Sequence, residues 1–405
     1  MKAGKRILAG TLCLMMILGG CTSESANNKK ESVENNKKED ANQSKLDALQ
    51  PHAYGNVQGL SLEPGAIISL IGRQEKTAYW MAVKEGAQAA VDAINANLGY
   101  KGDDKVTLNY SAPETENDVD GQVNILDEEL DRYPVAVGIA LADASASQVQ
   151  FDMAAYNGIP VVAFDSGTEY KDVVCMVDTN NTEAAATAAA KLCDAISDSG
   201  EILMFVHDSS STSAGSREDG FVNAIASEHP GVTIANIYHL DELDAVKRQV
   251  AAEMAQEKEE TAEAEETSEE EETEEEKEDV ISEIASSLTE EDVIRYIFEQ
   301  HPEARGVYTT SESATKAVLN VIDTYENKEE YKIVGFDGGE DQLKRLEDGE
   351  ITGLIVQNPY GIGYATVVAC ARAAMGEGNE AIVDAGFTWV TAKNLNEKAI
   401  QNMMY

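Results

Sequence analysis

The stretch Ile159-Pro160-Val161-Val162-Ala163-Phe164-Asp165 decides the fold class. It is an apolar, β-branched run that ends on a charged residue, and such runs are typical of buried strands in parallel sheets. Similar runs recur at Ala66–Ile71, Val106–Tyr110, Val135–Leu141, Ile202–His207, Val232–Tyr238, Gly306–Thr310, Ile333–Phe336 and Gly353–Val356. Helical patterns lie between them, among them Ala78–Asn97, Ala144–Asn157, Thr182–Ser197, Ser216–Glu228, Ser311–Tyr325 and Gly361–Met375. This alternation predicts an α/β fold of doubly wound parallel sheets, whose ligands bind beyond the carboxyl ends of the strands.

The N-terminus predicts secretion and a lipid anchor. Three basic residues precede an apolar run at 7–18, which is too short for a stable membrane-spanning helix and is typical of a signal peptide, here residues 1–20. Leu18-Gly19-Gly20-Cys21 resembles a bacterial lipobox, which implies that Cys21 becomes the lipidated first residue of the mature protein on the outer side of the membrane. The alternative is an ordinary signal peptide that contains a cysteine. The polar composition of 21–60 predicts a disordered tether.

Length and charge narrow the class of protein further. About 350 residues follow the tether, more than one hydrophobic core usually supports, so two lobes are expected. The formal net charge of -43 argues against nucleic acid and anionic lipid as partners, because both require basic surface. The remaining cysteines, Cys175, Cys193 and Cys370, have neither the number nor the spacing of a disulfide framework or a metal site, although one pair remains open. No metal or cofactor is expected.

Five short motifs carry a resemblance to a known family. They are Ala78-Tyr79-Trp80 before Lys84-Glu85-Gly86-Ala87, the 159–165 stretch, Arg217-Glu218-Asp219-Gly220-Phe221, Val334-Gly335-Phe336-Asp337-Gly338 and Val356-Gln357-Asn358-Pro359. In this order and spacing the set resembles the ribose- and galactose-type periplasmic binding proteins, called type I. The resemblance runs from about Gly65 to the C-terminus, apart from one insertion.

The resemblance implies a two-lobed receptor with a three-segment hinge. The hinge segments would lie near Thr179-Asn180, Gln357-Asn358 and Phe387–Trp389, which gives an N-terminal lobe of 64–179 plus 358–388 and a C-terminal lobe of 180–357 plus 389–405. The implied protein is a monomer that closes around a small polar ligand, most simply a monosaccharide, and delivers it to an ABC transporter permease. A sensor subunit for a membrane receptor kinase, and a binder of a nucleoside or an autoinducer-type furanose, are the alternatives.

The resemblance also assigns ligand contacts. Tyr79 and Trp80 stand where the family has aromatic rings that stack on a sugar, and Asp165 and Asp337 where carboxylates accept sugar hydroxyls. The other expected contacts are Arg217, Gln357, Thr310 and Arg73. A sugar has an apolar C–H face and a belt of hydroxyls, so aromatic and charged side chains at strand ends suit it on physical grounds as well.

Some observations count against a simple ribose binder or against binding roles. Ala140 and Leu243 stand where ribose binders have an amide and an aromatic side chain, and Thr310 replaces a second amide. The aromatic residues could instead belong to the core, the aspartates could cap turns, and Arg217 could pair with Glu218 on a solvated helix face.

An acidic insertion and the absence of catalytic motifs complete the prediction. Residues 255–287 interrupt a helical region of the C-terminal lobe, and residues 257–279 contain fifteen acidic side chains against two lysines. Such a run is either disordered or a solvated helix, and a cation-binding role is a weaker alternative because Ca²⁺ loops are absent.

Without a nucleophile elbow, a zinc-protease motif or a phosphate loop, no enzyme is predicted, although Asp165 and Asp337 could form a glycosidase pair.

Overall fold

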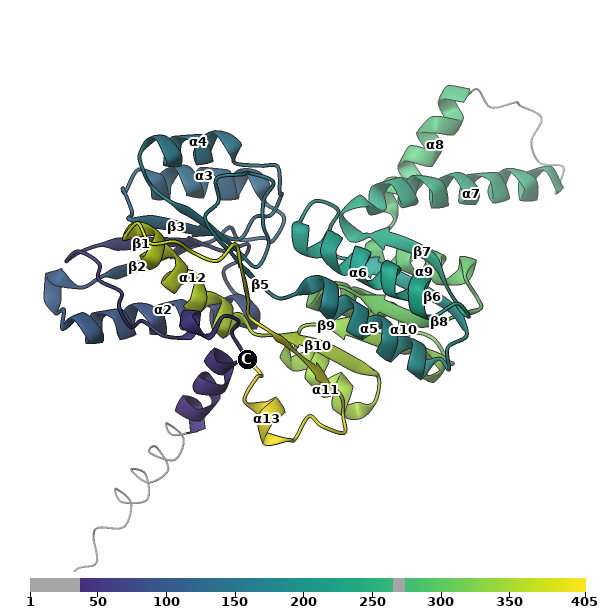
Figure 1. Cartoon of the computed structure of the whole chain (residues 1–405). Helices are drawn as coiled ribbons and strands as arrows, with labels where there is room; N and C mark the ends of the chain where they lie inside the picture. The colour runs from purple at the N-terminus through teal and green to yellow at the C-terminus, as the bar shows by residue number, and fades with distance from the viewer. Residues whose placement is uncertain (1–36, 265–273) are drawn as a thin grey trace, which may run out of the picture.

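Two α/β lobes, each built on one six-stranded sheet, make up the computed structural model (Figure 1). The structure describes residues 37–264 and 274–405, with the side chains of 257–264 and 274–276 excepted. The first sheet has the strand order β11-β5-β4-β3-β1-β2 and the second has the order β12-β10-β9-β8-β6-β7. All neighbouring strands are parallel except β12, which runs antiparallel to β10. We call the lobe of the first sheet the N-lobe and that of the second the C-lobe.

The predicted strands agree with the structure, and three short strands are additional. The N-lobe strands are β1 (Ile67–Ile71), β2 (Thr107–Ser111), β3 (Ala136–Ile139), β4 (Val161–Phe164), β5 (Met176–Asp178) and β11 (Ile382–Asp384). The C-lobe strands are β6 (Gly200–Val206), β7 (Val232–His239), β8 (Ala304–Thr309), β9 (Lys332–Phe336), β10 (Gly353–Gln357) and β12 (Phe387–Val390). The unpredicted strands β5, β11 and β12 have three or four residues, too few to show a period in the sequence.

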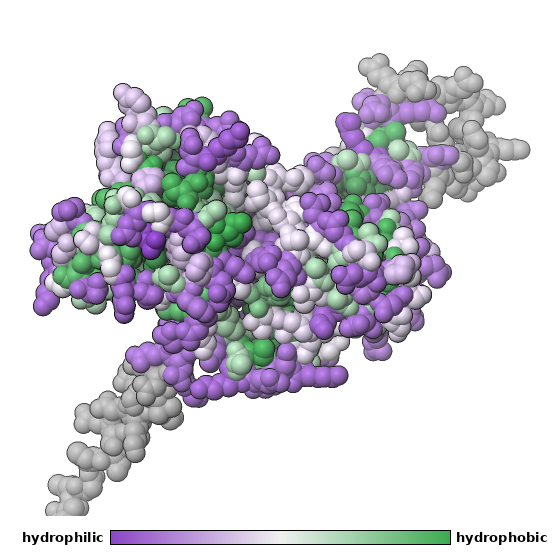
Figure 2. Space-filling model, viewed as in Figure 1, coloured by the Kyte–Doolittle hydropathy of each residue, from purple (hydrophilic) through white to green (hydrophobic). Residues whose placement is uncertain are grey.

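Helices cover both faces of each sheet, so each lobe has two apolar cores. In the N-lobe, α2 (Ala78–Leu98) packs with α12 (Pro359–Ala374) on one face, and α3 (Val119–Leu130) with α4 (Gln148–Tyr156) on the other. In the C-lobe, α5 (Asn181–Ala195) packs with α6 (Thr212–Glu228), and α10 (Glu312–Ile322) lies with α9 (Glu290–Gln300) and α11 (Glu340–Asp348). On the face drawn in Figure 2, hydrophilic residues cover much of both lobes, with smaller hydrophobic areas between them.

The α2–α12 contact depends on two glycines. A Cβ atom at Gly86 would lie 1.9 Å from the backbone oxygen of Tyr360, and one at Gly363 would lie 1.9 Å from that of Val83. Only glycine therefore lets these helix backbones approach so closely. The contact matters for the site, because α2 carries the aromatic pair at its first turn.

The chain passes between the sheets three times. It leaves the N-lobe after β5 at residues 179–180 and returns between β10 and α12 at 357–358. The third passage lies at Ala385-Gly386, since Phe387 already pairs with Gln357 in the C-lobe sheet. The expected third hinge segment at Phe387–Trp389 is therefore wrong by about two residues, because the antiparallel strand β12 that fixes the crossover was not predicted.

The expected disordered tether is wrong for its second half. Residues 37–47 form a helix, which is followed by the short 3-10 helix η1 (His52–Gly55). Lys45 Nζ donates to the backbone oxygen of Met404 at 2.7 Å, Leu49 is fully buried, and Gln50 forms a β-bridge with Asp384. A few apolar anchors in a polar segment therefore fix it against the hinge. Residues 1–36, with the predicted signal peptide and Cys21, lie outside the described residues.

The acidic insertion forms a helical projection from the C-lobe (Figure 1). Helix α7 (Leu243–Ala264) runs outward and α8 (Glu274–Ser287) returns, and the two helices contact each other. Val280, Ile281 and Ile284 of α8 are half-buried. The described parts of the insertion are thus helical, as in the solvated-helix alternative, and its last residues carry an apolar face that the composition did not suggest.

The cysteines that the sequence left open are free and buried: Cys175, Cys193 and Cys370. Burial raises the pKa of the Cys175 and Cys193 thiols to about 12, so both behave as small apolar groups. In the described part of the chain, no helix has the length and apolar character needed to cross a membrane.

Candidate ligand-binding site

A cavity of about 220 Å³ lies between the lobes at the carboxyl ends of their strands. The N-lobe lines it with Arg73, Gln74, Thr77, Tyr79, Trp80, Glu116 and Asp165. The C-lobe lines it with His207, Ser213, Arg217, Ser311, Glu312, Ser313, Lys316, Asp337 and Gln357. The structure therefore brings together seven of the eight ligand contacts expected from the sequence.

Asp165 and Asp337 occupy equivalent positions in the two lobes. Each directly follows a buried strand, and each backbone N–H donates at 2.8 Å to the adjacent strand, Asp165 to Val177 and Asp337 to Ile355. Both residues have a left-handed backbone, with φ of +59° and +73°. A non-glycine residue in this region is strained, and such strain gathers at functional sites. The two sheets thus aim one carboxylate each at the cavity.

The aromatic pair lies in the first turn of α2. Thr77 caps this helix by accepting from the backbone N–H of Trp80 at 3.3 Å. The rings of Tyr79 and Trp80 meet edge to face at 5.2 Å. The Tyr79 hydroxyl donates to the Asp165 carboxylate, so this tyrosine holds a neighbouring site residue as well as offering a ring. Burial raises the pKa of Asp165, and the hydrogen bond from Tyr79 lowers it in part.

Arg217 projects from α6 and is held on three sides. Its Nε donates to Asn181 Oδ1 at 2.8 Å and its Nη1 to the backbone oxygen of Thr310 at 2.7 Å, while the guanidinium lies 4.0 Å from the ring centre of Phe336. The alternative pairing with Glu218 does not occur, because Glu218 hydrogen-bonds His239 at 2.7 Å. Arg217 is thus a positioned cation in the cavity wall and not a surface residue.

Gln357 connects the cavity to the hinge. Its side chain donates to Asp337 Oδ1 at 2.7 Å and accepts from Thr179 Oγ1 at 2.9 Å. Thr179 and Gln357 belong to two different hinge segments. A change in hinge geometry therefore moves a hydrogen-bond partner of a site carboxylate.

Thr310 is not among the cavity-lining residues, and the ligand contact expected of it stays a prediction. Its hydroxyl lies 2.7 Å from His207 Nδ1 and accepts from the backbone N–H of His207 at 2.9 Å. His207 takes the cavity position instead. Burial lowers the pKa of His207 to about 3, so the imidazole is neutral near pH 7. Ala140 and Leu243 are both buried in apolar cores, away from the cavity lining.

Arg73 reaches across the cleft to the other lobe. Its Nη2 lies 2.8 Å from Asp208 Oδ2, and it also donates to Asn117 Oδ1 at 3.1 Å. Asp208 in turn accepts from the backbone N–H groups of Ser210 and Ser211 at 3.1 and 2.7 Å. The guanidinium is therefore part of an ion pair between the lobes as well as part of the cavity wall.

The sequence analysis missed several polar lining residues, although a signal for them existed. Glu116 lies in the loop after β2, Ser311 and Glu312 follow β8, and His207 follows β6. All of these residues lie just after parallel strands, where the ligands of such sheets bind.

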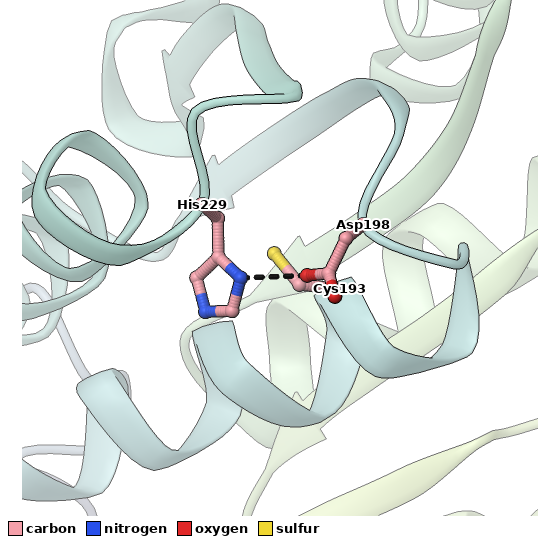
Figure 3. A group of neighbouring side chains, drawn as sticks. All are labelled: Cys193, Asp198 and His229. Carbon is pink, nitrogen blue, oxygen red and sulfur yellow. Dashed lines mark hydrogen bonds and ion pairs between the residues drawn. The ribbon is translucent and has the colours of Figure 1, made fainter.

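A second polar group lies apart from the cavity, in the C-lobe (Figure 3). Cys193, Asp198 and His229 each offer one potential metal ligand within 4.8 Å of the others. His229 Nδ1 already lies 2.7 Å from Asp198 Oδ1, and Cys193 belongs to the apolar core. This hydrogen bond ties the end of α6 to the loop before β6, which is a sufficient role for the pair.

Comparison with known proteins decides the family. The model of the periplasmic binding protein domain matches residues 68–265 and 269–378. The chain belongs to the periplasmic binding protein family. The ribose import binding protein of Haemophilus influenzae is 25% identical over 307 residues, which cover 75% of this chain and 84% of that protein.

Solved periplasmic binding proteins share the fold. A carbohydrate transporter solute-binding protein from Agrobacterium radiobacter, in complex with D-arabinose, superposes with a TM-score of 0.66 at 23% identity, covering 84% of this chain and 99% of that one. A glucose-galactose binding protein from Geobacillus stearothermophilus gives 0.62 at 20% identity, covering 82% and 99%. The predicted type I periplasmic binding protein fold is confirmed.

Proposed function

We propose that this periplasmic binding protein captures a monosaccharide by closing its two lobes around it. The observation that carries the proposal is the composition of the cavity wall. Aromatic rings, carboxylates from both lobes and a fixed guanidinium meet the needs of a ring with an apolar face and many hydroxyls. Ligand contacts from both lobes favour the closed state, and this differential affinity drives closure.

The sugar-binding proposal has a direct test. We expect isothermal titration of the purified protein with ribose, arabinose, galactose, fucose, tagatose, glucose and their amino derivatives to give saturable binding of at least one sugar. A nucleoside and an autoinducer-type furanose belong in the same panel, because they represent the alternative ligands. If no sugar binds while a nucleoside does, the cavity has been assigned to the wrong class of ligand.

We further propose that the protein is a membrane-anchored, extracytoplasmic monomer that delivers its ligand to an ABC transporter permease and catalyses no reaction. The lipobox-like stretch ending in Cys21 supports the anchor. Replacing Cys21 by Ser should release the protein from the membrane fraction. Co-purification of a permease, as opposed to a receptor kinase, decides between transport and sensing.

A further inference from the structure

The charged side chains around the cavity do not balance. Four carboxylates line it, Glu116 and Asp165 from the N-lobe and Glu312 and Asp337 from the C-lobe. Three cations also line it, but the Arg73 charge is already paired with Asp208. Lys316 is exposed to solvent, which weakens its interaction with the interior. The enclosed part of the cavity therefore has a negative excess.

Two of the four carboxylates lack a direct partner in the described part of the chain. Asp165 accepts from Tyr79, and Asp337 accepts from Gln357. Within the described residues, the carboxylates of Glu116 and Glu312 have neither a hydrogen-bond nor an ion-pair partner. A half-buried carboxylate in this situation is unfavourable until a cation or a donor arrives.

The electrostatics of Glu116 and Glu312 point the same way. Burial raises the pKa of Glu116, which Arg73 partly offsets, and the charges of Asp165 and Asp337 raise it further. Burial likewise raises the pKa of Glu312, and Asp337 adds to the effect. Carboxylates contributed by both lobes thus repel one another in the closed state, and a cation between them would relieve this repulsion.

Arg73 indicates that the ligand also carries an acceptor oxygen. Its side chain is almost fully buried and its Nε has no hydrogen-bond partner among the described residues. A buried donor of this kind needs an acceptor oxygen. The ligand must therefore bring a hydroxyl or ring oxygen as well as a positive charge, and a plain alkylamine offers only the second.

We propose that the ligand is an amino sugar with a free amine, whose ammonium group lies between Glu116 and Glu312 while its oxygens face Arg73 and Arg217. This inference rests on the proposed function, because it specifies which sugars the cavity takes. Acidic sugars should be rejected, since their carboxylate would add to the negative excess.

The test compares matched sugars by isothermal titration at low salt. The probes are D-glucosamine, D-glucose, D-glucuronate and N-acetyl-D-glucosamine, together with the corresponding galactose and mannose series. We expect at least one amino sugar to bind ~10-fold or more tightly than its neutral parent, with no binding of the acid. If a neutral sugar binds and no amino sugar exceeds its parent, the inference falls and the proposed function stands. If no sugar in either panel binds, both fall.

Variants locate the effect at the carboxylates. Glu116→Gln keeps the size of the side chain and should bring the preference for the amine down to about parity with the neutral sugar, a loss of roughly tenfold in the ratio of affinities. Glu114→Gln, two residues earlier and exposed, is the matched control and should leave the ratio unchanged. Glu312→Gln provides a second route if Glu116→Gln unfolds. An equal loss of affinity for both sugars in the glutamine variants would overturn the inference.

Discussion

Arg73 of the N-lobe and Asp208 of the C-lobe form an ion pair across the cleft, with 2.8 Å between Nη2 and Oδ2 and only 2% of each side chain exposed. Further contacts between the lobes lie nearby: Ser210 Oγ donates to the backbone oxygen of Ala142 at 3.2 Å, and the backbone N–H of Gly167 donates to Thr212 Oγ1 at 2.6 Å. These contacts need no ligand. They stabilise a closed arrangement that ligand binding then completes.

Replacing Asp208 by Asn should therefore open the ligand-free protein. The change leaves the buried Arg73 charge unpaired, which typically costs roughly 3–5 kcal/mol and is avoided if the lobes separate. Small-angle scattering should show a larger radius of gyration, and sugar affinity should fall because closure becomes less favourable. Asp241→Asn is the control, since among the described residues Asp241 bonds only to Ser209, within the C-lobe. An unchanged radius of gyration with normal affinity would show that the ion pair does not set the closed state.

Replacing Asp337 by Asn should weaken binding of the best sugar from the panel by about 2 kcal/mol or more, because a charged acceptor of sugar hydroxyls becomes a neutral one. Asparagine tolerates the left-handed backbone at φ +73°, so folding should be nearly intact. Calorimetry gives the affinity and thermal unfolding checks the fold. Asp341→Asn, an exposed change in the first turn of α11, should have no effect on affinity. Equal affinity of both variants would refute the assignment of Asp337.

The last residue of the chain should also affect binding. The Tyr405 hydroxyl accepts from the backbone N–H of Gly338 at 3.0 Å, and its ring packs edge to face on Tyr79 at 5.7 Å. Tyr405 thus supports one site loop from each lobe. Tyr405→Phe keeps the ring but loses the hydrogen bond, which should reduce sugar affinity by about threefold to tenfold. Tyr133→Phe is a control, because Tyr133 is 74% exposed. If Tyr405 positions the site, sugar selectivity should change together with sugar affinity, whereas a general loss of stability would leave selectivity unchanged. Neither affinity nor selectivity should change in Tyr133→Phe.

The fold was predictable because nine apolar runs between helical patterns indicated the longer parallel strands, whereas the short strands β5, β11 and β12 gave no such signal. The cavity was predictable only in part. Residues at strand ends such as Asp165 could be selected, but nothing in the sequence indicates that Arg73 pairs with Asp208, which is 135 residues away. The N-terminal helix was missed for a related reason. Composition averaged over a polar segment hides single anchors such as the buried Leu49 and Tyr54, and the Tyr54 hydroxyl donates to Asn379 near the other end of the chain.

The hinge carries a pair of carboxylates that should make stability depend on pH. Asp178 and Asp384 are paired in register on β5 and β11, immediately before two of the hinge segments. Burial, followed by the Asp384 charge and then that of Asp165, raises the pKa of Asp178 to about 7, and Arg217 offsets this only in part. The folded protein then holds a proton that the unfolded chain has lost. The stability from Asp178 is fully present only below about pH 4, the ordinary pKa of the unfolded carboxyl, and is lost progressively as pH rises from there through about 7.

Asp178→Asn should therefore raise the melting temperature at pH 8 by on the order of a few degrees and have little effect near pH 4. Melting curves of both proteins across this range give the difference directly, and taking the difference removes the contributions of other titrating groups. Asp172→Asn, an exposed change in the loop before β5, should follow the unmodified protein at every pH. If Asp178→Asn also melts like the unmodified protein at every pH, the Asp178 carboxylate is ionised in the folded protein across the whole pH range.

The acidic projection should be dispensable for binding a neutral sugar but not for attracting a cationic one. Its densest part, residues 257–279, contributes a net charge of -13. The structure places 257–264 on α7 and 274–279 on α8, while the cavity is lined by residues from other elements. A deletion of 257–279 closed by a short Gly-Ser link retains Val280, Ile281 and Ile284, which are half-buried on α8, so the fold should survive.

The affinity for a neutral sugar should stay within about twofold, since its binding does not depend on the field of the projection. An amino sugar should bind less tightly to the trimmed protein at low salt, and the difference should vanish at high salt, where charges more than ~10 Å apart are screened. Calorimetry with both sugars at two salt concentrations separates these effects. A large loss of affinity for the neutral sugar would show that the projection contacts the cleft.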